Sequence, residues 1–330
     1  MSTSLIAWIT RAIIFGSVVM FGAIGETLTE KSGNLNLGTP GIMAVGGAMS
    51  FVVNFLYEQN CPNPSRFVCV VLALAVGFLS AALVGLLYSV LTTSLRANQN
   101  VTGLTITIFG VGFAKFVALY VIPTGAVSIK ATLSNEVFSA RLFYIPALGV
   151  FSELLLSYGF MMYLAILLAI ATHFFLYRSR TGMNLRAVGE NPATADAAGI
   201  SVTRYKYLAT CVGAGISGLG GIYYVLDYSY GTWATAAGSS IESLAWLSVA
   251  LVIFASWKPL NIIWGSYIFG MCFWAYNYVP VITGWQINTD LAQMLPYVVT
   301  IVVLIISSIK KSMENPAPTS LGLTYFREER

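Results

Sequence analysis

The polar segment 178–206 holds the residue types of a short helix that another molecule could contact. Asn191 can cap a helix, Pro192 suits its first position, and Gly199 suits the position just after its end. Small, helix-favouring residues lie between them, and strongly apolar runs flank the segment on both sides. We therefore predict a short helix at about 190–200 that lies outside the apolar part of the protein. An ordinary loop carrying a surface helix is the alternative.

Three further polar stretches interrupt apolar sequence and could contact a solute. The stretch 25–41 is rich in glycine and asparagine, and irregular backbone is tolerated at membrane depth only when it is buried in protein or lines a wet cavity. We expect its end, 34–41, to open onto a substrate path, with an aqueous loop as the alternative. The stretch 96–102 is a second such break, and 238–243 places Glu242 at a helix start, where a carboxylate complements the helix dipole. Trp233 could stack on a ring-bearing solute, although an interfacial aromatic belt is its default role. The residues expected to line the path are Asn34, Asn36, Gly38, Asn98, Asn100, Thr102, Trp233, Ser239, Ser240 and Glu242.

The sequence lacks the common patterns of nucleotide hydrolysis, metal binding and nucleophilic catalysis. It contains no GxxxxGK[ST] phosphate loop, no HExxH and no GxSxG. Its one histidine, His173, has no second histidine or carboxylate beside it, and its four cysteines form no CxxC pair. Glu26, Glu30 and Lys31 are expected to be interfacial or mutually compensated rather than substrate ligands. We therefore expect a protein that is not an enzyme, that binds no cofactor or metal and that hydrolyses no ATP itself.

The composition places these polar stretches in a membrane protein. The chain has 330 residues, of which 57% are hydrophobic and 9% charged, whereas soluble domains carry about 25% charged residues. Several runs reach the ~20 apolar residues that cross a bilayer, and none shows the alternation of a β-barrel. The net charge of +4 is small and suggests no nucleic-acid partner. The first apolar run begins near Ser4 without a basic leader, so we expect no cleavable signal.

The apolar runs predict an all-α polytopic membrane protein with about 8–10 transmembrane helices, as one transmembrane domain over 1–330. Two of the runs, at 42–57 and 243–257, are short for a full crossing and follow polar, glycine-containing sequence. Short, interrupted segments in the two halves of a chain are typical of broken or re-entrant helices around a transport pathway. The predicted spans are Ser4–Ile24, Ile42–Tyr57, Phe67–Leu91, Thr105–Ile122, Tyr158–Tyr177, Tyr207–Leu226, Ser243–Trp257, Ile262–Tyr278 and Leu291–Ile309.

The distribution of lysine and arginine predicts the orientation. The segment 178–206 is basic and, by the positive-inside rule, cytoplasmic; the tail 310–330 begins with Lys310-Lys311 and is expected on the same side. Four predicted spans between them return the chain to that side. The loops 123–157 and 227–240 then lie outside, the former with a short surface helix. We expect a multi-pass protein of a prokaryotic cell membrane, in contact with lipid.

Three sequence blocks carry a family resemblance that covers most of residues 5–310. Gly25–Met43, Thr181–Ile200 and Gly238–Gly270 resemble the N-terminal, cytoplasmic coupling and second-half pore blocks of ABC-importer permease subunits. The chain thereby resembles the branched-chain amino acid/ribose permease superfamily, and within it the nucleoside/simple-sugar branch. It departs from the family at 239–243 and 254–258, where arginine-containing sequences are replaced. The coupling block is the most specific of the three.

The resemblance implies a type II-like permease built of two pseudo-repeated halves, and it implies partners. A separate ABC ATPase, which would bind ATP and Mg, would receive the coupling helix in a groove. A homologous second permease subunit, identical or not, and an extracytoplasmic substrate-binding protein would complete the importer. The residues that the resemblance assigns to coupling are Arg186, Ala187, Val188, Gly189, Glu190, Asn191, Pro192, Ala193, Asp196 and Gly199.

The function expected from this resemblance is import of a nucleoside-like solute by alternating access. The same machinery importing a simple sugar, a riboflavin-like compound or a branched-chain amino acid is the first alternative. An ion-coupled secondary transporter would need acidic or histidine relays inside the spans, and aspartate is nearly absent there. A channel or structural subunit is the remaining alternative, and it would show no dependence on ATP.

Overall fold

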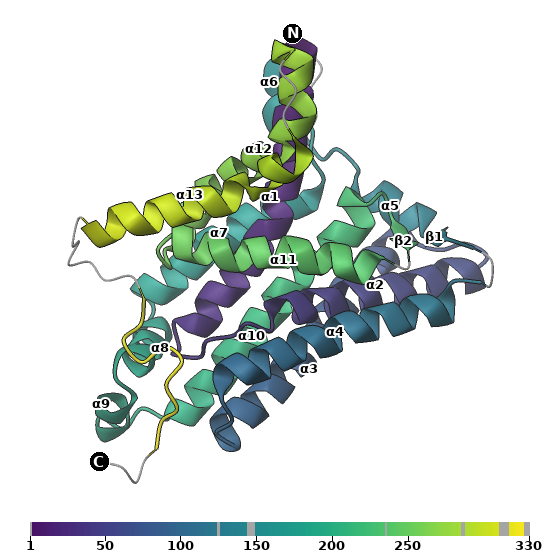
Figure 1. Ribbon diagram of the computed structural model, residues 1–330. Helices are drawn as coiled ribbons and strands as arrows, with labels where there is room; N and C mark the ends of the chain where they lie inside the picture. The colour runs from purple at the N-terminus through teal and green to yellow at the C-terminus, as the bar shows by residue number, and fades with distance from the viewer. Residues whose placement is uncertain are drawn as a thin grey trace.

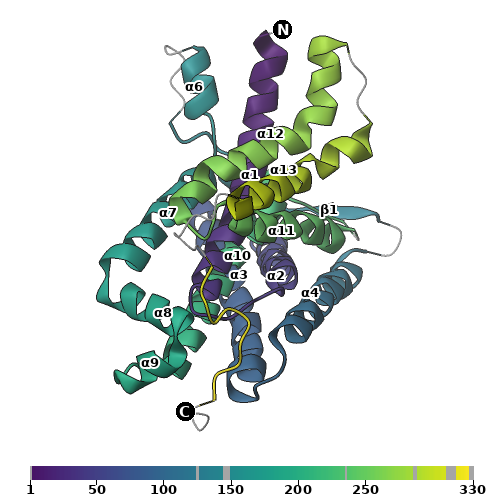
Figure 2. The same cartoon turned by 60° about the vertical axis from the view of Figure 1, so that its left-hand side comes forward.

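The computed structural model describes residues 2–123, 126–143, 149–234, 236–284, 288–309 and 317–326. Within these ranges the chain is almost wholly helical, and long helices cross one another in a bundle (Figures 1 and 2). The tail residues predicted at 310–316 and 327–330 lie outside the described residues. The long helices are α1 (Ser2–Glu30), α2 (Thr39–Asn60), α3 (Arg66–Ser89), α4 (Gln99–Val121), α7 (Phe160–Arg178), α10 (Val202–Tyr223), α11 (Ala237–Phe254), α12 (Pro259–Thr283) and α13 (Thr289–Ile309).

Shorter elements cap the two ends of the bundle. A π-helical turn extends α3 (η1, Val90–Ser94), and another extends α10 (η3, Tyr224–Tyr228). Two short strands, β1 (Ser128–Lys130) and β2 (Thr232–Ala234), pair antiparallel with Ile129 opposite Trp233. The remaining short helices are α5 (Thr132–Phe138), α6 (Val150–Leu155), α8 (Arg180–Glu190) and α9 (Pro192–Ala197).

The helix ends define two opposite faces of the molecule (Figure 1). We call the first the α8–α9 face; it contains these two helices, the turns at 31–38 and 95–98, and the described tail 317–326. The second, the β1–β2 face, contains the two strands and α5. The predicted return of 207–309 to the side of the coupling segment stays a prediction, because residues 310–316, which follow α13, lie outside the described residues.

Glycine lets the central helices pack with their backbones in contact. A Cβ on Gly25 of α1 would lie 2.2 Å from the Gly213 carbonyl oxygen of α10, and one on Gly221 of α10 would lie 2.0 Å from the Met43 carbonyl oxygen of α2. Helices in lipid associate through such close contacts of small residues, because no hydrophobic effect drives them together. α10 is therefore the central helix of the bundle and contacts α1, α2 and α3 most closely.

The helices confirm the predicted all-α polytopic membrane protein, and they differ from the prediction in two details. Seven helices in the described ranges are long and apolar enough to cross a membrane, and α12 and α13 cover the two remaining predicted spans. α2 is continuous over 22 residues, although its apolar part is short, because Pro40 occupies the first helical turn, where a missing N–H costs nothing. α8 is a helix that the sequence analysis treated as loop, since its polar residues hide the helical pattern.

Candidate functional site

The α8–α9 pair begins and ends at side chains suited to those positions. The Ser179 hydroxyl accepts a hydrogen bond from the Gly182 N–H at 2.9 Å, which caps α8. The Asn191 side chain accepts one from the Thr194 N–H at 3.0 Å, and Pro192 follows it as the first residue of α9. Gly199 has a φ of +81°, the left-handed conformation that glycine adopts without steric cost. Asn191 thus separates two short helices within the predicted coupling segment.

A small apolar core holds the pair against the bundle. Val188, Ala195 and Val202 are buried together, with Tyr325 of the tail packed beside them. α8 approaches the 31–38 turn closely at Gly189, where a Cβ would lie 2.3 Å from the Lys31 carbonyl oxygen. Any side chain at this position would push α8 away from the turn.

The predicted coupling residues divide by exposure along the two helices. Val188 and Gly189 face the bundle and are buried. Arg186 is half-buried, with its guanidinium 4.6 Å from the centre of the Tyr177 ring. The others form the outer surface of the pair: Pro192 and Asp196 are half-buried, and Ala187, Glu190, Asn191, Ala193 and Gly199 are exposed.

The described tail lies across this surface. The Glu190 carboxylate accepts hydrogen bonds from the Thr319 N–H at 3.2 Å and from its hydroxyl at 2.8 Å. The Gly189 carbonyl accepts from the Ser320 N–H at 3.1 Å, and the Tyr325 hydroxyl lies 3.0 Å from an Asp196 carboxylate oxygen. The tail and the start of α9 together line a groove of about 310 Å³. The sequence analysis assigned the tail to the same side of the membrane but predicted none of these contacts.

Lys31 is a buried cation beneath α8. It is 7% exposed, and burial together with the charges of Arg186 and Lys258 lowers the pKa of Lys31 to about 8. The carboxylates of Glu190 and Glu30 oppose this shift. Charge at the underside of the α8–α9 pair is therefore sensitive to mildly alkaline pH.

The first six predicted path residues lie together near the α8–α9 face. The Asn34 amide donates to the Thr210 hydroxyl at 3.0 Å, and the Asn36 side chain accepts from the Gly38 N–H at 3.0 Å, so these side chains shape the buried turn. Asn98 caps α4 by accepting from the Val101 N–H at 3.1 Å. Of the remaining two, Thr102 is buried and Asn100 is exposed.

The other four lie near the β1–β2 face. Trp233 is fully buried, and its ring stacks on Phe51 with 5.6 Å between centroids. Ser239, Ser240 and Glu242 are half-buried at the start of α11. α4 packs against α11 and α2, so it connects the two groups of predicted path residues.

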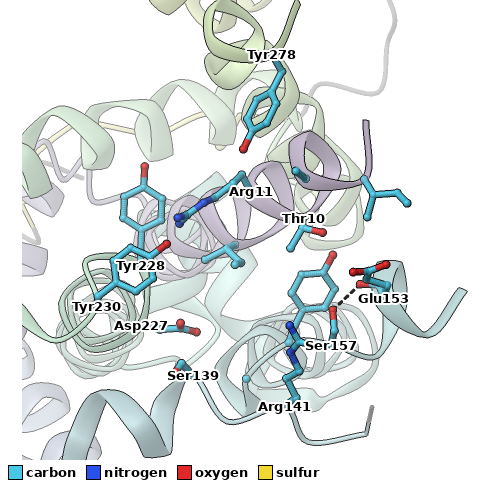
Figure 3. A pocket seen from close by; sticks show the side chains of 15 residues that line it. Thr10, Arg11, Ser139, Arg141, Glu153, Ser157, Asp227, Tyr228, Tyr230 and Tyr278 are labelled. Atoms are coloured by element: carbon cyan, nitrogen blue, oxygen red, sulfur yellow. Dashed lines mark hydrogen bonds between the residues drawn. The ribbon is translucent and has the colours of Figure 1, made fainter. Parts of the chain in front are cut away.

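A third polar site, which the sequence analysis missed, is a cavity of about 460 Å³ between α1, the segments 139–143 and 149–159, and η3 (Figure 3). We call it the α1–η3 pocket. Figure 3 shows Arg11, Asp227 and several tyrosines around it. Burial raises the pKa of Tyr158 in its wall to about 12, so this hydroxyl stays protonated. Arg11 lies inside an apolar run and Asp227 at the edge of another, which gave no signal that the two would meet.

A family model for the permease component of branched-chain amino acid transport systems matches residues 8–304. The chain belongs to this family. The predicted resemblance to permease subunits is therefore confirmed, and the protein is a multi-pass membrane permease subunit.

Curated relatives match the chain over nearly its whole length. A putative glucose ABC transporter permease protein of Haloferax volcanii, TsgC13, is 28% identical over 94% of this chain and 95% of its own. The nucleoside ABC transporter permease protein NupC of Lactococcus lactis subsp. cremoris is 28% identical over 97% of both chains. The guanosine ABC transporter permease protein NupQ of Bacillus subtilis is 25% identical over 98% of this chain and 97% of its own. No solved structure matches the chain.

Proposed function

We propose that this permease is the membrane-spanning subunit of an ATP-driven importer of nucleosides. Two of the relatives above carry nucleoside or guanosine transport in their names and match nearly the full chain. The chain itself would hydrolyse no ATP; ATP and Mg would bind to a separate ATPase subunit. The observation that carries the proposal is the exposed α8–α9 pair in a chain of this family.

The charge distribution supports a cytoplasmic position for the α8–α9 face. Positive residues are retained on the cytoplasmic side of membrane proteins. This face gathers most of the basic residues that the structure describes, including those of the predicted coupling segment. They are Lys31, Arg96, Arg178, Arg180, Arg186, Arg204, Lys206 and Lys258.

The shape of the α8–α9 pair supports docking into an ATPase groove. Glu190, Asn191 and Ala193 present exposed side chains at the junction of the two helices. Beneath them, Val188 and Gly189 are buried against the bundle. A force applied by the ATPase to the exposed side would therefore move the 31–38 turn and the helices that it joins, which is how closure of the ATPase would drive alternating access.

The remaining partners would occupy the sides of α4 and the β1–β2 face. α4 exposes a band of apolar side chains that includes Ile108, Phe109 and Phe116, and a Cβ on Gly112 would meet nothing within 4 Å. We assign this band to a second permease subunit, because the predicted path residues lie near both ends of α4. The extracytoplasmic binding protein would deliver substrate at the β1–β2 face.

Transport and docking can be tested in one preparation. The complete importer is reconstituted in proteoliposomes, and ATP-dependent uptake of guanosine, uridine, glucose and leucine is measured. We expect saturable nucleoside uptake that requires ATP. Ala193→Arg, which places a bulky charge on the exposed side of α9, should abolish co-purification with the ATPase.

A matched variant separates docking from a general effect of charge. Thr203 is exposed on the same face but outside α8 and α9, so Thr203→Arg should leave co-purification and uptake intact. Retention of the ATPase by Ala193→Arg would contradict the docking site. Uptake of glucose in place of nucleosides would favour the second candidate function, sugar import, which the name of the Haloferax relative supports.

A further inference from the structure

The α1–η3 pocket has the size and position of a solute site near the β1–β2 face. Its volume of about 460 Å³ lies within the range of small-molecule sites, about 300–1,000 Å³. One wall is α1, with Thr10 and Arg11; the floor is η3, with Asp227 and Tyr228 (Figure 3). The pocket lies at the outer half of α1, far along the chain from the turn at 31–38.

Its charged side chains suit a neutral polar ligand. Arg11 and Arg141 are balanced by Glu153 and Asp227, so the lining favours neither an anion nor a cation. The Asp227 side chain is only 8% exposed and interacts electrostatically with Arg11. A buried carboxylate accepts hydrogen bonds from hydroxyl and N–H groups, and a guanidinium donates to carbonyl oxygens.

Aromatic rings supply the surface that a flat ring system would stack on. Tyr228, Tyr230 and Tyr278 all line the pocket, and Figure 3 shows the Arg11 side chain between Tyr278 and the other two rings. The Arg11 guanidinium lies 5.1 Å from the centre of the Tyr230 ring. Such cation–ring pairs orient the guanidinium and leave its remaining N–H groups for a ligand.

The backbone beneath the pocket is irregular in two independent ways. η3 is a π-helical turn, in which the Ser229 N–H donates to the Tyr224 carbonyl at 2.8 Å. Tyr230, which follows, has a φ of +56°, a left-handed conformation that costs free energy in a bulky residue. Both features are common at functional sites of proteins. Their free-energy cost is tolerated there because the irregular backbone orients side chains. Here they bring Asp227, Tyr228 and Tyr230 to one cavity.

We propose that the α1–η3 pocket binds a neutral, hydroxyl-bearing ring compound, a nucleoside in the importer proposed above, before it crosses the membrane. Asp227 accepts hydrogen bonds from the ligand, Arg11 donates to it, and the tyrosine rings stack on its base. The assignment of the ligand as substrate rests on the proposed function. The existence of the site rests on the pocket alone.

Binding to the permease without the binding protein tests the proposal. Tritiated guanosine and uridine are titrated against the purified permease in nanodiscs, with glucose and leucine as competitors. Asp227→Asn and Arg11→Met should each weaken nucleoside binding by about 10- to 100-fold, the loss expected for one hydrogen bond to a charged group. In the complete importer the same variants should raise the KM for uptake while co-purification with the ATPase is unchanged.

The chain offers a matched pair of controls near the same face. Arg66 and Glu136 form an exposed ion pair with 3.9 Å between nitrogen and oxygen, outside the pocket. Arg66→Met and Glu136→Gln remove the same charges and should bind nucleoside like the wild type. Thermal unfolding of all four variants checks that each is folded.

The outcomes separate this proposal from the proposed function. The proposed site is wrong if folded Asp227→Asn and Arg11→Met keep the wild-type nucleoside affinity and the wild-type KM. It is also wrong if the wild-type permease binds no nucleoside at millimolar concentration while the complete importer transports nucleosides. Absence of ATP-dependent nucleoside uptake by the complete importer would overturn the proposed function instead. Saturable binding of glucose without binding of nucleosides would show that the ring compound bound by the pocket is a sugar.

Discussion

The Glu190 carboxylate accepts both of its described hydrogen bonds from one residue of the tail, Thr319. Glu190 is the last residue of α8, and Ser320 binds the neighbouring Gly189 carbonyl through its N–H. The junction between α8 and α9 is therefore fastened on its outer side by a segment distant in sequence. This contact makes the order of the junction depend on the tail.

The double substitution Thr319→Val with Ser320→Ala should loosen the junction. It removes two hydroxyl donors, worth about 1–2 kcal/mol together. Hydrogen exchange of the 187–197 amides should accelerate roughly 5- to 30-fold, since exchange there reports local opening. The control Ser201→Ala removes an exposed hydroxyl on the same face that makes no capping bond. Unchanged exchange in the double variant would show that the tail does not order the junction.

Gly189→Ala should weaken the packing of α8 on the 31–38 turn. The added Cβ would lie 2.3 Å from a backbone oxygen, which cannot rotate away, and overpacking of this kind costs about 1–3 kcal/mol. We expect a lower midpoint of thermal unfolding in detergent. Ala187→Val adds volume to an exposed position of the same helix and should leave the midpoint unchanged. Equal midpoints for the two variants would be incompatible with the close contact at Gly189.

The lowered pKa of Lys31 predicts that the free energy of unfolding depends on pH in the alkaline range. Its pKa of about 8 in the folded protein lies below the ordinary 10.5, so the unfolded chain binds more protons between these values. Stability should therefore rise as the pH increases from about 8 to about 10.5, by an amount on the order of 1–3 kcal/mol. Below about pH 8 this contribution is constant.

Lys31→Met should reduce that rise by the share that Lys31 contributes, because methionine carries no proton to lose. The measurement is the midpoint of thermal unfolding against pH, with the exposed Lys130→Met as the control that keeps it. If stability rises with pH as much in Lys31→Met as in the wild type, the rise comes from another group.

Glu26 and Thr39 join the end of α1 to the start of α2. The Thr39 hydroxyl donates to the Glu26 carboxylate, and both side chains are buried. Glu26→Ala should lower stability by about 1–3 kcal/mol, the usual cost of leaving a buried hydroxyl without its acceptor. Glu26→Gln keeps an acceptor oxygen in place and should cost less. Glu136→Ala, at an exposed position, serves as the control, and an equal loss in Glu26→Gln and Glu26→Ala would argue against the hydrogen bond.

The sequence predicted features that depend on neighbouring residues and missed those that depend on how helices cross. The Asn191 cap, Pro192 at the helix start and the turn at Gly199 are local, and the structure has each of them at its expected position. The membrane spans follow from long apolar runs, which need no knowledge of packing. α8 was missed because its polar surface carries no apolar stripe wide enough to signal a helix.

The α1–η3 pocket could not be predicted, because its residues come from segments that are far apart in the sequence. Arg11 and Asp227 approach each other because α1 and α10 pack side by side, with backbone contacts at Gly25 with Gly213 and at Val18 with Gly220. Each helix is apolar on most sides, so the sequence does not show which face meets which. The contacts of the tail were hidden for the same reason, since Thr319 and Ser320 are ordinary surface residues in sequence.

The hydrogen bonds from Thr319 to Glu190 also impose an order on biosynthesis. The two residues are 129 positions apart, and residues 317–326 follow every described helix in the chain. The ribosome therefore releases α8 and α9 long before it makes the segment that fastens them. The α8–α9 surface is complete only after the last membrane helix has been synthesised, so a nascent permease that stalls before that point would expose an unfastened surface to its partner.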